Sequence, residues 1–313
     1  MRPALPRFQD SALPWVRAAV LGFAMSGLPL FAFGAGLQVV DDTGQTVTLS
    51  RPAQRIISLA PHLTEDLFAV GAGAQVAGAV AYSDYPAAAR QVPRIGDSAQ
   101  LDLERVVALR PDLIVAWESG NAAAQLQRLT ALGVPIYRSE ARDFDAIAST
   151  LRRLGELTGH AAQAQARARN FEAQIAALRE HYSSRREVSV FYQIWHQPLL
   201  TINGTHLISH ALTLCGARNV FGSLAPLTPA VSAEAVLGAD PEAIVTGSVD
   251  LQGPDNLDTW RRFKGLRAQR RGNLIVVNPD TLHRQSDRVV EGVAELCQKL
   301  DAARIKPAIK GRG

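Results

Sequence analysis

The chain has 313 residues, of which 47% are hydrophobic and 20% are charged, a composition typical of globular proteins. This length predicts one large domain or two of average size. The formal net charge is only +4, and no dense stripe of lysine and arginine occurs along the chain. These features argue against a nucleic-acid-binding protein.

Residues 1–35 have the layout of a secretory signal peptide. Three arginines precede an apolar run from Ala18 to Phe33, and small residues follow that would suit cleavage after Gly34. The alternative is a membrane anchor, but the run is shorter than the roughly 20 residues that span a bilayer. We therefore expect cleavage and a soluble, exported mature protein.

Two stretches of the chain resemble each other. LERVVALRPDLIVAW (103–117) and AEAVLGADPEAIVTG (233–247) place Glu104 opposite Glu234 and Pro111 opposite Pro241. Each reads as a short helix with an acid near its start, then a turn and a buried strand. Many α/β proteins contain such units, but the shared spacing of glutamate and proline predicts two similar lobes.

Predicted strands and helices alternate along the chain. The strands are expected at 55–60, 75–80, 112–117, 134–139, 188–193, 243–247 and 274–279. The helices are expected at 64–70, 121–132, 144–157, 206–215 and 288–300. This alternation predicts an α/β fold, and apolar runs such as DLIVAW suit parallel strands covered on both faces.

One long helix is predicted from His160 to Tyr182. The segment is rich in alanine, glutamine, arginine and glutamate, contains no proline or glycine, and would span about 35 Å as a helix. We expect it to join two Rossmann-like lobes as a stiff pair with limited closure. The expected domains are the N-terminal lobe at 36–158, the linking helix at 159–186, the C-terminal lobe at 187–304 and a basic tail at 305–313.

Cys215 and Cys297 lie in apolar, helix-like contexts. In an oxidising compartment such a pair is a disulfide candidate, whereas without export two buried free thiols would be the better interpretation. The expected export favours a bridge. On the chain-entropy model, a disulfide that closes so long a loop stabilises the folded state by roughly 4 kcal/mol. Their spacing does not resemble a metal site.

Three aromatic residues point to a ligand cleft. Tyr82, Trp117 and Trp195 each lie at or just past the end of a predicted strand. Ligands of open α/β sheets bind beyond the carboxyl ends of the strands. Core packing is the alternative for any single aromatic residue, but three at strand ends favour a cleft for a large, partly apolar ligand.

Three segments carry a resemblance to a known family: RIISLAPHLTEDLFAVGAGAQVAGAVAYSDYP (55–86), LDLERVVALRPDLIVAW (101–117) and LTLCGARNVFG (212–222). From about Arg55 to Leu300 the chain resembles the periplasmic cobalamin-binding proteins of ABC importers, which belong to the helix-linked class of periplasmic binding proteins. That class also serves siderophores and haem. The resemblance implies a monomeric periplasmic protein that carries a corrinoid as cargo, has no cofactor and delivers to an inner-membrane permease.

The resemblance also implies roles for individual residues. Tyr82 and Trp117 match aromatic residues that line the corrinoid cleft, and Asp280 matches an acidic residue near the ligand. Glu104 and Glu234 match surface glutamates, one in each lobe, that dock onto arginines of the permease. The two cysteines match the family's disulfide.

The chain departs from the family at two positions. A tryptophan of the N-terminal lobe is replaced by Ser98, and a second, in the C-terminal lobe, is replaced by Thr228. Trp195 and His196 in YQIWHQP are expected to recover part of the lost stacking. The departures leave cobalamin, cobinamide and other corrinoids open as the ligand.

Histidines could serve either the rim of the cleft or a bound metal. His62, His196 and His283 are expected as ligand-facing polar residues, and direct ligation of cobalt or iron is the less favoured role, best suited to His196. No metal site of the protein itself is expected. The alternatives to a corrinoid-binding protein are a haem or ferric-siderophore protein of the same fold and an exported two-lobe hydrolase.

No catalytic motif supports an enzyme. GxSxG and Gly-rich phosphate loops do not occur in the sequence. The neighbouring acids Glu65 and Asp66 read as the first turn of a helix, with Thr64 as a possible N-cap. In the YSDYP segment, Asp84 and Pro86 are expected to shape the loop and Tyr85 to pack.

Overall fold

The structure is a computed structural model that describes residues 36–97, 100–247 and 256–305. The predicted signal peptide, Ser98 and the tail from residue 306 onward lie outside the described residues. Within the described ranges, no helix combines the length and apolar character needed to cross a membrane.

The N-terminal lobe is built on a parallel sheet with the strand order β4-β3-β5-β6. Its strands are β3 (Ile56–Ser58), β4 (Val76–Ala79), β5 (Leu113–Trp117) and β6 (Ile136–Ser139). Its helices are α1 (Pro61–Ala69), α2 (Leu103–Ala108) and α3 (Ala123–Thr130), with 3-10 turns at Gly73–Gln75 and Ala87–Gln91. All four strands were predicted from the sequence, and parallel pairing is confirmed.

An antiparallel hairpin precedes this sheet and was not predicted. Its strands are β1 (Leu37–Val40) and β2 (Thr46–Leu49), and their alternating exposure shows that one face packs on the lobe. Asp41 closes the turn by accepting hydrogen bonds from the backbone N–H groups of Thr43 and Gln45.

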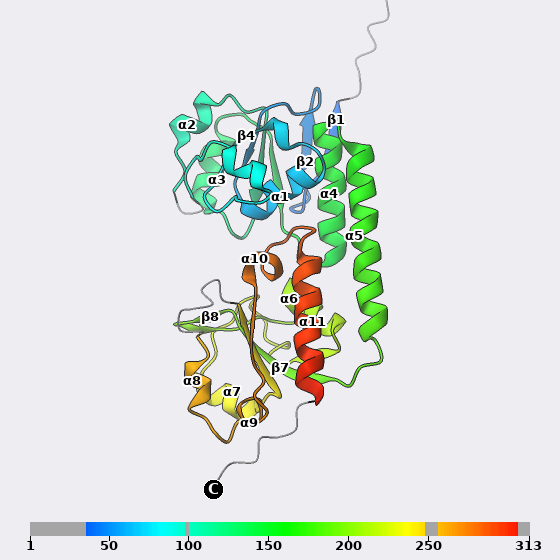
Figure 1. Cartoon of the computed structure of the whole chain (residues 1–313). Helices are drawn as coiled ribbons and strands as arrows, with labels where there is room; N and C mark the ends of the chain where they lie inside the picture. Colours follow the sequence, from blue (N-terminus) through cyan, green and yellow to red (C-terminus); the bar gives the residue numbers. More distant parts are fainter. Residues whose placement is uncertain (1–35, 98–99, 248–255, 306–313) are drawn as a thin grey trace, which may run out of the picture. The chain divides into compact units, whose positions relative to one another are not determined.

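Two long helices lead to the second lobe (Figure 1). The helix α4 (Phe144–Thr158) ends at Gly159, whose φ of 80° is the left-handed conformation that glycine tolerates. The chain then turns into α5 (Ala161–Tyr182), which confirms the predicted linking helix. The buried residues of α5 recur at spacings of three, four or seven and form one stripe: Ala164, Ala168, Phe171, Ile175 and Tyr182.

The C-terminal lobe repeats the architecture with the strand order β10-β7-β11-β12, again all parallel. Its strands are β7 (Val188–Gln193), β10 (Ala217–Asn219), β11 (Ala243–Gly247) and β12 (Leu274–Val277), and a short hairpin pairs β8 (Trp195–His196) with β9 (Leu199–Leu200). Its helices are α6 (Leu207–Leu214), α7 (Ala233–Ala239), α8 (Asp258–Arg261), α9 (Arg267–Arg270), α10 (Pro279–Leu282) and α11 (Val289–Ile305).

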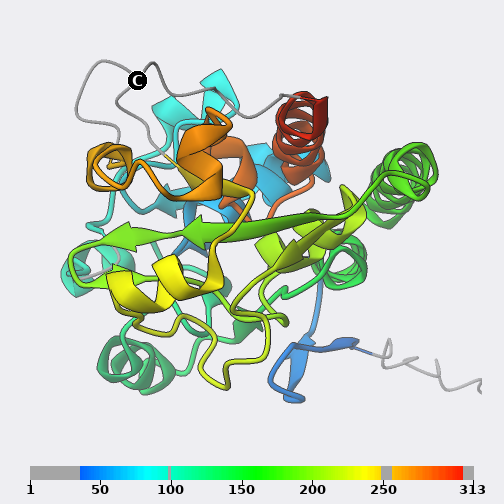
Figure 2. The ribbon, with the colours of Figure 1, turned by 90° about the horizontal axis from the view of Figure 1, so that it is seen from below.

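Helices cover both faces of this second sheet, as Figure 2 shows for α7 and α11 on opposite sides of β7. Val190 of β7 belongs to the same apolar cluster as Val293 of α11. The next residue, Phe191, points the other way and packs with Val236 of α7. Coverage on both faces explains why all six residues of β7 are buried.

The sequence repeat corresponds to a structural repeat. In each lobe a short helix precedes a buried strand, α2 before β5 and α7 before β11. Asp102 caps α2 by accepting from the N–H of Arg105, and Ser232 caps α7 by accepting from the N–H of Ala235. The two units therefore share their register as well as their spacing.

One apolar cluster runs through both lobes. It includes Leu63 of α1, Leu151 of α4, Phe171 of α5 and Leu212 of α6, so the two long helices carry the core from one lobe to the other. The disulfide between Cys215 and Cys297, which was predicted, lies in this cluster and ties the end of α6 to α11. The α/β fold with two lobes and a helical link is thus as expected.

Candidate functional site

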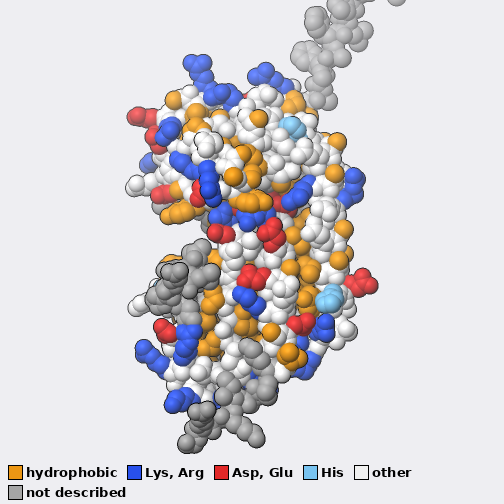
Figure 3. Space-filling model, in the orientation of Figure 1, with side chains coloured by type: hydrophobic (Ala, Val, Ile, Leu, Met, Phe, Trp, Pro, Cys, Tyr) orange, Lys and Arg blue, Asp and Glu red, His pale blue; other side chains and the backbone are white. Residues whose placement is uncertain are grey.

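The carboxyl ends of the two sheets meet where the lobes touch. Strand β3 leads into α1, and Glu65 of α1 lies 2.6 Å from Nη1 of Arg284, measured from its Oε1. Arg284 follows β12 and α10 in the other lobe. Figure 3 shows the surface hollowed between the lobes, with acidic and basic side chains gathered at their junction. A ligand at the strand ends would therefore contact both lobes.

Tyr82 and Trp117 lie at the ends of two N-terminal strands, β4 and β5, which lie on either side of β3. Tyr82 follows β4, with a left-handed backbone (φ 64°) and a side chain that is 75% exposed. Trp117 is the last residue of β5 and is half-buried. Its ring lies over Gly120, where a Cβ would come within 1.8 Å of it, so this position requires glycine.

His62 is buried beneath Trp117 instead of lying at a polar rim. Its ring meets the indole edge-on at 5.3 Å, and its side chain is 4% exposed. Burial, with a smaller contribution from Arg284, lowers the pKa of His62 to about 3. The imidazole is therefore neutral at physiological pH, and it supports the tryptophan from below.

Trp195 and His196 form the β8 side of the short hairpin, and both are exposed. Their rings are 5.6 Å apart and tilted by 36°. The indole N–H of Trp195 donates to the carbonyl oxygen of Gln197 at 3.0 Å, which fixes the ring orientation. The hairpin thus presents an aromatic surface directly after β7.

Asp280 and His283 follow β12 on and after α10. Asp280 is exposed and forms an ion pair with Arg284 at 2.9 Å. His283 lies 2.6 Å from the Tyr192 hydroxyl, measured from its Nε2, and burial lowers its pKa to about 4. Asp280 is thus available to a ligand, whereas the ring of His283 is already engaged.

Asp84 stabilises the YSDYP loop, as expected. It forms an ion pair with Arg94 at 3.0 Å. Ser83 is buried and accepts a hydrogen bond from the Thr64 hydroxyl at 3.1 Å. Tyr85 is 44% exposed, and the Arg288 guanidinium from the other lobe lies 3.6 Å from its ring centroid. The tyrosine therefore packs against a cation of the opposite lobe.

The predicted N-cap at Thr64 is wrong. Helix α1 begins three residues earlier, at Pro61, because proline fits the first position of a helix, where no N–H donor is needed. Glu65 and Asp66 consequently lie in the middle of α1, not in its first turn, and both are buried. The contact of Glu65 with the other lobe was not predicted from the sequence. The position of both acids inside the apolar run LTEDLF is the signal that could have indicated their burial.

Glu104 and Glu234 occupy equivalent places. Each is the second residue of its short capped helix, and each side chain is exposed. One lies on each lobe, as the sequence repeat predicted.

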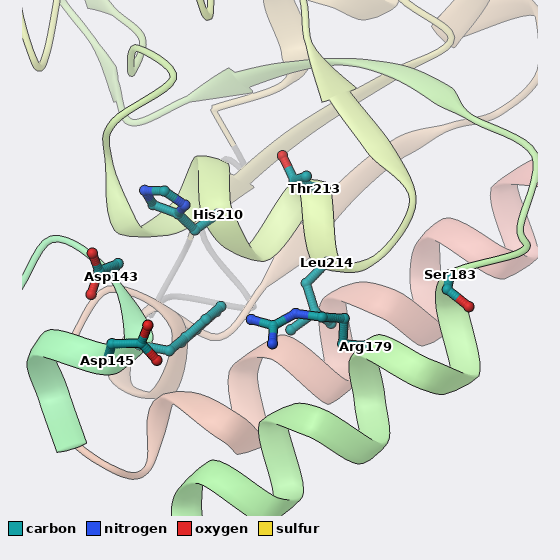
Figure 4. A pocket seen from close by; sticks show the side chains of 8 residues that line it. Asp143, Asp145, Arg179, Ser183, His210, Thr213 and Leu214 are labelled. Atoms are coloured by element: carbon teal, nitrogen blue, oxygen red, sulfur yellow. The ribbon is translucent and has the colours of Figure 1, made fainter.

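The cavities found among the described residues lie elsewhere. One of about 330 Å³ lies between the start of α4, the end of α5 and α6, and Figure 4 shows Asp143, Asp145, Arg179 and His210 around it. Another of about 710 Å³ lies beside the β1–β2 hairpin. Neither is lined by the predicted ligand-facing residues. Within the described ranges, no three acidic, histidine or cysteine side chains converge as a metal site would require.

We expect acid to destabilise the protein through three histidines whose pKa values are lowered by full or partial burial. His62, His206 and His283 have folded-state pKa values of about 3, 4 and 4, against 6.5 for an exposed histidine. The unfolded chain therefore binds more protons below pH 6.5, and each histidine should cost about 2 kcal/mol at pH 5. Urea unfolding between pH 7.5 and 5 measures this loss.

The variant His62→Gln tests the contribution of one of these histidines to the pH dependence of stability. The control is His181→Gln, because His181 is exposed. The free energy of unfolding of His62→Gln should fall less steeply with decreasing pH than that of the wild type, while His181→Gln should follow the wild type. Equal slopes for the wild type and His62→Gln would contradict the neutral state of His62.

Comparisons with known proteins agree with this fold. A model of the periplasmic binding protein family matches residues 56–281. The chain is 33% identical over 258 residues to a vitamin B12-binding protein of Vibrio parahaemolyticus, which covers 82% of this chain and 93% of that protein. A vitamin B12-binding protein of Yersinia pestis is 35% identical over 251 residues, with coverages of 80% and 88%.

Solved structures show the same similarity. The periplasmic vitamin B12 binding protein BtuF of Vibrio cholerae superposes with a TM-score of 0.75 at 33% identity, covering 82% of this chain and 99% of that one. A periplasmic heme-binding protein of Pseudomonas aeruginosa reaches 0.68 at 26% identity, covering 82% and 95%. With the matched family model and the two-lobe architecture, these relatives show that the chain belongs to the periplasmic binding protein family.

Proposed function

We propose that this protein is a periplasmic binding protein for cobalamin or a related corrinoid. It takes the corrinoid between its two lobes as a monomer and delivers it to an inner-membrane ABC permease. The observation that carries the proposal is the similarity to vitamin B12-binding proteins over four fifths of the chain, together with aromatic residues at the strand ends of both lobes.

The chemistry of the hollow supports this cargo. A corrinoid is a broad, flat ring with amide groups at its edge, and it needs apolar faces with a few polar partners. Tyr82, Trp117 and Trp195 offer aromatic faces, and all three are at least partly accessible. Asp280 offers a carboxylate to the amide N–H groups, and His196 offers an exposed imidazole.

The direct test is a titration of the purified protein with cyanocobalamin and with cobinamide, followed by calorimetry. We expect saturable one-to-one binding at micromolar or lower concentration. Absence of heat with both compounds at tens of micromolar would reject a corrinoid as the cargo.

Trp117→Ala should weaken corrinoid binding by about 10-fold to 100-fold. The substitution removes a half-buried indole at the end of β5, and loss of an aromatic anchor in a binding site typically costs about 2 kcal/mol. Calorimetry with cyanocobalamin measures the effect. Tyr182→Ala is the matched control, because Tyr182 is buried at the end of α5, before the start of β7 and so at the opposite end of that strand from Trp195. Unchanged affinity of Trp117→Ala would remove Trp117 from the site.

Haem is a second candidate, favoured by the 26% identity to a heme-binding protein of the same family. An axial ligand to haem iron would have to come from a free side chain, and His196 is exposed on β8. Titration with haemin, followed by the Soret absorption band, separates the two ligands. A shifted Soret band in the wild type that is lost in His196→Ala would favour haem over a corrinoid.

A further inference from the structure

A buried carboxylate of the N-terminal lobe contacts the C-terminal lobe. The side chain of Glu65, in α1, is 1% exposed, and its Oε1 lies 2.6 Å from Arg284 Nη1 and 3.1 Å from Arg288 Nη1. Its Oε2 accepts a hydrogen bond from the Ser286 hydroxyl at 2.7 Å. Both oxygens of the carboxylate are thus occupied by the segment between α10 and α11 of the C-terminal lobe.

Each of the two arginines also contacts a second residue. Arg284 uses its other terminal nitrogen for the ion pair with Asp280. Arg288 lies over the ring of Tyr85 in the YSDYP loop. One carboxylate therefore contacts two guanidinium groups, and these in turn contact the carboxylate of Asp280 and the ring of Tyr85.

The neighbouring Asp66 plays a different part. It is fully buried, and neither carboxylate oxygen has a hydrogen-bond partner within the geometric limits of a normal bond. Burial, and then the nearby charges of Asp287 and Glu65, raise its pKa well above the usual range. The charged form of Asp66 is therefore less favoured than that of an exposed aspartate.

The remaining charges balance. The described cations of the cluster are Arg284, Arg288 and Arg167 of α5, which pairs with Asp287. Against them stand the carboxylates of Glu65, Asp280 and Asp287. Burial raises the pKa of Glu65, while the Ser286 hydrogen bond and the two arginines act in the opposite direction. His62, which also faces Arg284, is neutral. Removing the charge of Glu65 would leave two guanidinium groups short of a partner.

We propose that Glu65 is a positioning residue for cargo binding: it holds Arg284 and Arg288 in place across the lobes, so that Asp280 and Tyr85 are arranged before the cargo arrives. This inference rests on the proposed function, in which the cargo enters between the lobes. A surface arranged in advance loses less conformational entropy on binding than one that must be ordered by the ligand. Glu65 contributes to affinity in this way without touching the cargo.

The test compares two neighbouring substitutions of the same kind, Glu65→Gln and Asp66→Asn. Each replaces a buried carboxyl group by an amide of nearly equal volume, but only the first removes a carboxylate that contacts Arg284 and Arg288. We expect Glu65→Gln to weaken cyanocobalamin binding at least 10-fold in calorimetry at pH 7.5, and Asp66→Asn to change it less than 2-fold. Wild-type affinity in Glu65→Gln, or an equal loss in Asp66→Asn, would overturn the proposal.

The pH profile of binding separates positioning from a merely structural role. Burial raises the pKa of Glu65, so wild-type affinity should fall with decreasing pH as Glu65 takes up a proton, and the affinity of Glu65→Gln should depend less on pH. Parallel profiles for the two proteins would overturn the proposal. If Glu65→Gln does not fold, Ser286→Ala, which removes one hydrogen bond to the carboxylate, should weaken binding by a smaller factor in the same direction, and an unchanged affinity would overturn the proposal.

Amide hydrogen exchange tests the inference without any cargo. In Glu65→Gln, the amides of residues 283–289 should exchange at least 10-fold faster than in the wild type, and in Asp66→Asn they should not. Exchange unchanged in Glu65→Gln would overturn the proposal even if cobalamin binds. If the exchange results are as expected but the wild type binds no corrinoid, the proposed function is rejected. The inference that Glu65 positions the two arginines would then still be supported.

Discussion

Replacing both cysteines with alanine should lower the free energy of unfolding by about 4 kcal/mol, because the disulfide closes a loop of 82 positions. Both sulfurs are fully buried, and the bridge joins the end of α6 to the middle of α11. The loop holds most of the C-terminal sheet, so its loss enlarges the unfolded ensemble of the whole lobe. Urea unfolding of the double variant measures the change.

The control uses a reductant. Dithiothreitol should lower the urea midpoint of the wild type toward that of Cys215→Ala/Cys297→Ala, and it should leave the midpoint of the double variant unchanged. A double variant within about 1 kcal/mol of the oxidised wild type would show that the bridge is dispensable for stability.

Changing Glu104 and Glu234 together to alanine should abolish transport while leaving cargo affinity intact. Both side chains are exposed, one on each lobe, at the second position of a capped helix. Truncating one partner of a charge pair that becomes buried on docking costs about 2 kcal/mol or more. Two such losses predict a permease affinity roughly a thousandfold lower. Stimulation of the permease's ATP hydrolysis by loaded protein measures the effect.

The matched control removes two acidic side chains from the long helices. Glu156 of α4 and Glu180 of α5 are also exposed, and their double alanine variant changes the net charge by the same amount. It should stimulate the permease as the wild type does. Equal losses in both double variants would indicate a nonspecific effect of charge, and loss of cargo affinity in Glu104→Ala/Glu234→Ala would contradict a docking role.

The fold was largely predictable because its main signals are local. Buried strands such as β5 and β7 are continuous apolar runs, and α5 is an uninterrupted series of strong helix formers. Short elements carry no comparable signal. The β8–β9 hairpin has two residues per strand, and the β1–β2 hairpin is stabilised by its packing and by the side chain of Asp41.

The start of α1 shows a second reason why local sequence signals can mislead. Thr64 and the acids after it resemble a capping sequence, but Pro61 starts the helix one turn earlier. With this earlier start, Glu65 contacts Arg284 of the other lobe, which is more than 200 residues away in sequence. Asp66 is buried, and its carboxylate oxygens have no hydrogen-bond partner. Local propensity cannot report such a contact, because the charges that stabilise Glu65 come from a distant segment.

The sequence was sufficient to predict the α/β class, the long linking helix, the repeated helix–strand unit with its two glutamates, and the cysteine pair. These depend on periodicity and composition, which act over a few residues at a time. The folded structure was needed to show which buried polar groups have shifted pKa values, that His62 lies beneath Trp117, and that Glu65 contacts arginines of the opposite lobe. The physical reason is that desolvation and ion pairing depend on neighbours in space, and the folded chain alone brings those neighbours together.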